Sequence, residues 1–143
     1  MADKKTNGVA HLSDSFLATT RELVQKGLEE GVVDEDRDAF FEALYMLQSG
    51  DLDSAVDGFR SAARKCESPF DALSMVALAE CQRIQGREAA AIREWKKIAA
   101  DDEAPRAARY VAWRSLAALA ERREDQRLLE KANDALEQFP DHH

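Results

Sequence analysis

The feature that most constrains this chain is a repeat at a fixed spacing of 36 residues. Five positions recur at that spacing, each glycine, proline or apolar in both copies. Gly50, Ala55, Phe59, Ala62 and Pro69 correspond to Gly86, Ala91, Trp95, Ile98 and Pro105. This spacing lies in the range of repeats that form two helices each and stack on one another. We therefore expect a chain built from helical hairpins.

Apolar residues at helical spacing define the helices between these markers. They fall on one face from Leu52 to Ala63 and again from Ala91 to Ala99, and no segment shows the alternation of a half-buried strand. Gly50 and Gly86 each follow such a run, as expected at a helix end. The pattern predicts an all-α fold with three hairpins: 36–49 with 52–65, 69–85 with 87–100, and 105–122 with 125–138.

A separate first helix is expected over about residues 13–30, before the hairpins. Its apolar side carries Phe16, Leu23, Val24 and Leu28. This side has no hairpin mate in the sequence. It can fold into a groove of the hairpins or pair with a second copy of the chain, so a homodimer through this helix is one hypothesis.

The two better-preserved copies resemble the tetratricopeptide repeat (TPR) family. In that family an alanine and an aromatic residue four positions later pack the hairpin, and a glycine ends its first helix. Ala55 with Phe59 and Ala91 with Trp95 match. A third, degenerate copy has Arg123 where glycine is expected, and it continues with Leu128, Ala132, Ala135 and Pro140.

The resemblance implies a right-handed α-solenoid of three TPR-like hairpins preceded by one N-terminal helix. The expected organisation is a flexible tail over 1–12, the N-terminal helix and a linker over 13–35, a TPR-like domain over 36–140, and a short tail over 141–143. Repeats of this family bind other proteins, so the implied function is a non-catalytic adaptor or scaffold in a bacterial cytoplasm.

The resemblance also implies where a partner binds. In TPR proteins the first helix of each hairpin lines a concave groove with the second, fifth, ninth and twelfth positions of the repeat. The first repeat, counted from Asp36, supplies Arg37, Phe40, Leu44 and Leu47. The second, from Ala72, supplies Leu73, Val76, Glu80 and Arg83. The third, from Arg109, supplies Tyr110, Trp113, Ala117 and Ala120.

This groove is expected to be apolar in the first and third repeats, with Glu80 and Arg83 as a polar pair between them. It should bind an extended or helical segment of a partner protein with hydrophobic anchors, and Phe40, Tyr110 and Trp113 are the candidate hot spots. The alternative for Phe40 and Trp113, and also for Leu44, is ordinary core packing.

A narrower resemblance leads to a second function. An N-terminal helix, three repeats and an acidic chain are similar to the translocator chaperones of bacterial type III secretion. Gln48-Ser49-Gly50 and the run from Leu78 to Gly86 carry this likeness. It implies a cytosolic chaperone for a hydrophobic segment of a secreted protein, and the sequence leaves both roles open.

Charge disfavours one class of partner. The chain has 20 Lys and Arg against 28 Asp and Glu, a formal net charge of −8. Phosphate contacts need a basic field, so nucleic acid is not expected as a partner. Residues 1–58, with 13 acidic and 5 basic side chains, hold all of the excess negative charge. This region is either a solvated face or a surface that selects a basic partner.

Neither a membrane-spanning segment nor a secretory signal is expected, because no long apolar run is present and none follows Lys4 and Lys5. Cys66 and Cys81 lie outside any Cys-x-x-Cys pattern and are predicted to be reduced thiols of a cytoplasmic protein.

Catalysis is not expected either. The three histidines stand near the two ends of the chain, which leaves no partner for a serine or cysteine nucleophile. Residues 34–38 resemble the start of a calcium loop, but Ala39 and Tyr45 occupy the positions that need glycine and glutamate. No metal site and no cofactor is predicted, and a small hydrolase is the least favoured function.

Overall fold

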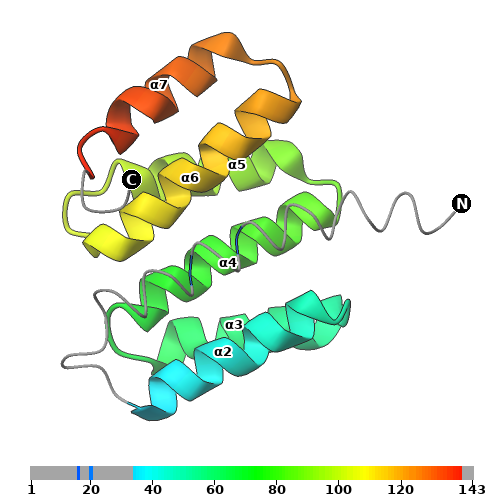
Figure 1. Ribbon diagram of the computed structural model, residues 1–143. Coiled ribbons are helices and arrows are strands. Elements are labelled where there is room, and N and C mark those ends of the chain that lie inside the picture. Colours follow the sequence, from blue (N-terminus) through cyan, green and yellow to red (C-terminus); the bar gives the residue numbers. More distant parts are fainter. Residues whose placement is uncertain (1–15, 17–19, 21–33, 140–143) are drawn as a thin grey trace, which may run out of the picture.

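The computed structural model describes Phe16, Thr20 and residues 34–139 (Figure 1). These residues contain no strand and six long helices: α2 (Asp34–Gln48), α3 (Leu52–Lys65), α4 (Phe70–Ile84), α5 (Glu88–Ala99), α6 (Arg106–Arg122) and α7 (Gln126–Leu136). The predicted all-α fold is confirmed, and each hairpin helix begins and ends within two residues of its predicted bounds.

Phe16 and Thr20 are also helical, as expected for the N-terminal helix. The rest of that predicted helix lies outside the described residues, and so do the predicted tails over 1–12 and 141–143.

The helices pack in two layers (Figure 1). Consecutive helices contact each other along the whole chain, first within the hairpins α2–α3, α4–α5 and α6–α7 and then between them. In addition α4 contacts both α2 and α6, which places these three helices side by side. We call α2, α4 and α6 the first-helix layer. No helix in the described part of the chain is long and apolar enough to cross a membrane.

The first helix of every hairpin ends in the same backbone motif. Gly50 and Gly86 have φ values of 90° and 89°, and Glu124 has a φ of 57°. Each donates its N–H to the carbonyl three residues back, while the next residue donates to the carbonyl five residues back. This is the left-handed helix end that glycine favours. The prediction had placed Arg123 at the glycine position, but the structural counterpart is Glu124, one residue later.

Aromatic side chains fill the core between the hairpins. Phe40 is fully buried, and its ring centroid lies 5.8 Å from that of Phe59 and 5.5 Å from that of Phe70. The repeated aromatic of the second hairpin, Trp95, is buried as well and donates its indole N–H to the Val76 carbonyl over 3.1 Å. The aromatic position of the repeat, Phe59 in one copy and Trp95 in the next, therefore lies in the core.

The chain closes the far end of the helix stack with Phe139, which follows α7. Its ring lies 5.5 Å from that of Tyr110 near the start of α6. The Arg106 guanidinium stands 4.5 Å above the same ring, within the range of a cation–π contact. These contacts fasten the end of the third hairpin to its beginning.

Candidate partner-binding site

Of the twelve residues predicted to line the partner groove, nine are buried, three are partly buried and none is fully exposed. Seven apolar ones are buried in the core: Phe40, Leu44, Leu47, Leu73, Val76, Tyr110 and Ala120. Trp113 is partly buried against that core. Phe40 and Leu44 pack as core side chains, which was the alternative that the sequence left open. The binding role of the twelve residues stays a prediction.

Arg37 lies at the start of α2 and is engaged by acids of its own helix. Its guanidinium is 3.3 Å from an Asp34 carboxylate oxygen and 3.8 Å from one of Asp38. Both pairs lie at the surface, where such contacts are weak.

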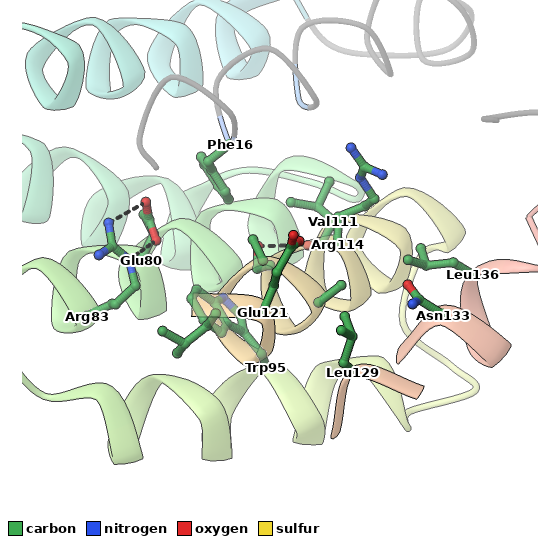
Figure 2. Close-up of a pocket in the computed structure, with 14 residues that line it drawn as sticks. Phe16, Glu80, Arg83, Trp95, Val111, Arg114, Glu121, Leu129, Asn133 and Leu136 are labelled. Carbon is green, nitrogen blue, oxygen red and sulfur yellow. Dashed lines mark hydrogen bonds and ion pairs between the residues drawn. The ribbon is translucent and has the colours of Figure 1, made fainter. Parts of the chain in front are cut away.

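The structure brings Glu80 and Arg83 to a cavity of about 450 Å³ that is lined by all four of the last helices (Figure 2). We call it the Phe16 cavity, because Phe16 forms part of its wall. Its other lining residues are Trp95 of α5, Val111, Arg114, Ser115, Ala117, Ala118, Leu119 and Glu121 of α6, and Leu129, Asn133 and Leu136 of α7. The exposed Arg114, Glu121 and Asn133 mark its rim.

Phe16 enters this cavity from the N-terminal part of the chain. Its side chain points inward, with the Glu80–Arg83 pair on one side and Val111 and Arg114 on the other (Figure 2). Only 6% of Phe16 is exposed. The apolar side of the N-terminal helix was expected either to fill a groove of the hairpins or to pair with a second copy. Phe16, the one described residue of that side, lies among the hairpins.

Thr20, one helical turn after Phe16, is fully buried. Its hydroxyl donates a hydrogen bond of 2.9 Å to the Phe16 carbonyl. This bond satisfies the hydroxyl within its own helix, so that a polar side chain can be buried there. Phe16 and Thr20 therefore define one buried helical face with a spacing of four residues.

Glu80 and Arg83 form a buried, two-pronged ion pair on one turn of α4. Arg83 Nε and Nη2 donate to the two Glu80 carboxylate oxygens over 2.8 and 3.1 Å. The two side chains are only 3% and 4% exposed. Burial raises the pKa of Glu80 above its ordinary value of 4.5, against the opposing effect of Arg83 and Arg122. Both oxygens are occupied, so the pair presents a satisfied polar floor to the cavity.

In the third repeat only one of the four predicted groove residues lines the Phe16 cavity. Ala117 does, whereas Tyr110, Trp113 and Ala120 do not. Because the glycine counterpart is Glu124, the repeat starts at Tyr110 and not at Arg109, and the groove positions become Val111, Arg114, Ala118 and Glu121. All four line the cavity. A shift of one residue turns a side chain by about 100° around a helix, which is why the predicted stripe faced elsewhere.

The two cysteines are free, as predicted. Burial first, and then the negative charge of Asp36, raise the pKa of the Cys66 thiol to about 11. Burial raises the pKa of the Cys81 thiol to about 12. In the described ranges, His, Cys, Asp and Glu form no group of three that could hold a metal ion.

Comparisons of the chain with protein-family models, curated proteins and solved structures found no match. We therefore interpret the site from its own residues.

Proposed function

We propose that this protein is a non-catalytic binding module, a right-handed solenoid of three TPR-like hairpins whose first-helix layer binds a segment of another protein. Within that layer α4 touches both of its neighbours, whereas the second helices α3, α5 and α7 make no comparable contact with one another. Closer packing on one side favours a stack that curves toward that side, as helical repeats do. The first-helix layer would then be the concave surface.

The observation that carries this proposal is the Phe16 cavity. At about 450 Å³ it has the size of a ligand site, and Phe16 shows that it accepts an aromatic side chain of a helical segment. The lining combines the apolar Trp95 and Leu129 with the exposed and charged Arg114 and Glu121, a mixture of apolar centre and polar rim that is typical of protein-binding pockets.

The side chains at the cavity favour binding over catalysis. Glu80, the one buried carboxylate that lines the cavity, is held in a two-pronged ion pair with Arg83 on its own helix, an arrangement typical of a structural group.

Site-specific photo-crosslinking tests the proposal. Arg114, on the cavity rim, is replaced by the photoreactive residue p-benzoylphenylalanine, and the full chain is irradiated in an extract of the source organism. Arg93, exposed on α5, receives the same residue as a matched control. We expect the Arg114 variant to capture a protein that the Arg93 variant does not, with the cross-link on a segment containing hydrophobic residues. Identical captures from both variants, or none from the Arg114 variant, would contradict the proposal.

The captured protein also separates the adaptor from the secretion chaperone, which would use the same surface. An adaptor's partner stays folded and dispersed when it is produced alone. A chaperone's client aggregates when it is produced alone and stays dispersed when it is produced together with this chain.

A further inference from the structure

The chain itself places one aromatic side chain, Phe16, at the wall of the Phe16 cavity, and this side chain indicates what kind of partner fits there. Phe16 and Thr20 lie four residues apart on one buried helical face. Side chains with that spacing are neighbours on a helix, the pattern by which amphipathic helices anchor in grooves. The cavity therefore already holds an aromatic anchor with a small residue one turn away.

The floor beneath the anchor needs no charge from its occupant. Arg83 donates two hydrogen bonds to Glu80, and the side chains are 4% and 3% exposed. Such a mutually satisfied pair can be covered by an aromatic ring without leaving an unpaired charge. An anchor that is large and uncharged fits this floor, and a charged one does not.

Phe16 does not fill the space available to it. A volume of about 450 Å³ remains beside its ring, bordered by Val111, Ser115 and Trp95. Side chains that line unfilled space lack part of their dispersion contacts. The anchor is therefore held less tightly than a core phenylalanine such as Phe40, and a bulkier ring could make contacts that Phe16 leaves unmade.

We propose that the partner segment is an amphipathic helix with an aromatic anchor, and that it replaces Phe16 of the chain's own N-terminal segment in the Phe16 cavity. This inference rests on the proposed function and adds the shape of the partner and its intramolecular competitor. A tethered competitor acts at a high effective concentration, so the partner binds the intact chain more weakly than a chain whose own anchor is removed.

A peptide of residues 13–30 of this chain, labelled with fluorescein, is the probe. Its affinity is measured by fluorescence anisotropy for the full wild-type chain and for full-length Phe16→Asp. We expect the peptide to bind the variant at least about tenfold more tightly than the wild type, because the variant lacks the competing Phe16 side chain. Full-length Phe16→Ala is the second variant, and it should show the same direction of change if Phe16→Asp loses helix content.

Matched peptides test the anchor. A peptide with Phe16→Ala should bind the full-length variant about tenfold or more weakly, and a peptide with Phe16→Trp should bind more tightly than the parent peptide. Equal affinity for the wild type and both variants, or binding that ignores the aromatic residue, would overturn the inference.

The occupant is tested by light scattering of the wild type and of Phe16→Asp. We expect monomers in both cases, because Phe16 lies in the cavity of its own chain. A wild-type dimer that the substitution dissociates would show that the occupant is a second copy, contrary to the inference.

The inference and the proposed function fail in different ways. If cross-linking at Arg114 captures a partner and the 13–30 peptide does not bind, the binding function stands and the competition with Phe16 fails. If the peptide binds as expected and Arg114 captures nothing, the cavity serves only the chain's own segment.

Discussion

At the scale of single residues, the Glu80–Arg83 pair shows how burial changes the role of charge. A buried carboxylate and guanidinium lose water that their mutual attraction only partly replaces. Here two short hydrogen bonds satisfy both oxygens of Glu80, and the raised pKa of that group records the remaining penalty of burial. The pair therefore fixes the shape of the cavity floor without adding much stability.

Removing one partner of this pair should lower the stability of the protein more than replacing both partners by apolar residues. Glu80→Ala leaves Arg83 buried without its partner and should lower the free energy of unfolding by about 3–5 kcal/mol. The double variant Glu80→Leu with Arg83→Leu should lose much less, or gain stability. Urea unfolding of Glu80→Ala, of Glu80→Leu and Arg83→Leu as single variants, and of the double variant measures this. A double variant as unstable as the sum of the single ones would contradict it.

The same carboxylate should give stability a distinct pH dependence. A group whose pKa is raised in the folded state stabilises fully below its ordinary pKa, here 4.5, and this contribution is lost as pH rises through the folded-state pKa. The wild type should therefore gain stability relative to Glu80→Gln as pH falls from about 7 toward 4.5. Urea unfolding across this range checks the sign, with the exposed Glu130→Gln as control. A stability advantage of the wild type over Glu80→Gln that stays constant or shrinks as pH falls would contradict this prediction.

Thiol reactivity should follow burial. With its pKa raised from 9.0 to about 11, Cys66 has on the order of a hundredfold less thiolate near pH 8, and its reaction with Ellman's reagent should slow accordingly on folding. Cys81, buried and with a pKa of about 12, should react more slowly still. Stopped-flow rates of Cys66→Ser and Cys81→Ser, native and in denaturant, separate the two thiols. Faster native reaction at Cys81 than at Cys66 would be inconsistent with this burial.

At the scale of elements, the three first helices end in one motif built from unequal residues. Gly50 and Gly86 adopt a positive φ at little cost. Glu124 adopts a positive φ as well, but its side chain makes this backbone conformation less favourable. The hydrogen bonds at all three ends are the same, so the motif is kept even where the preferred residue is missing.

Exchanging these residues should change stability in opposite directions. Glu124→Gly should stabilise the protein by about 0.5–1 kcal/mol, and Gly86→Ala should destabilise it by about 1 kcal/mol. Thermal unfolding of the two variants gives both signs. A loss of stability on Glu124→Gly would mean that other contacts of this side chain outweigh the backbone term.

The positions of the helices could be predicted because their sequence signals are local, but the side of α6 that lines the cavity could not. The glycines and the 3.6-residue pattern predicted the C-terminal ends of five of the six helices to within one residue. The third repeat lacks the glycine signal, so the sequence predicts its register one residue early. This register points to Tyr110 and Trp113, whereas Val111 and Arg114 line the cavity. A pattern within one helix also does not tell which neighbour covers Phe40, and α3 and α4 do so here.

At the scale of the whole molecule, the candidate site exists only because separate elements converge. Glu80 and Arg83 come from α4, Val111 from α6 and Leu129 from α7, and Phe16 reaches them from a distant part of the sequence (Figure 2). The sequence identified the polar pair through the repeat register. It could not place the cavity, because the packing of α4 to α7 around it depends on contacts between elements.

Chemical-shift mapping tests most directly whether a helix with an aromatic anchor binds the first-helix layer. Unlabelled 13–30 peptide is titrated into the full-length Phe16→Asp chain labelled with ¹⁵N. We expect the largest amide shifts at Glu80 and Arg83 of α4 and at Val111 and Ser115 of α6, with little change along the exposed side of α3 and α5. Shifts concentrated on α3 and α5, or spread evenly over all helices, would contradict this account.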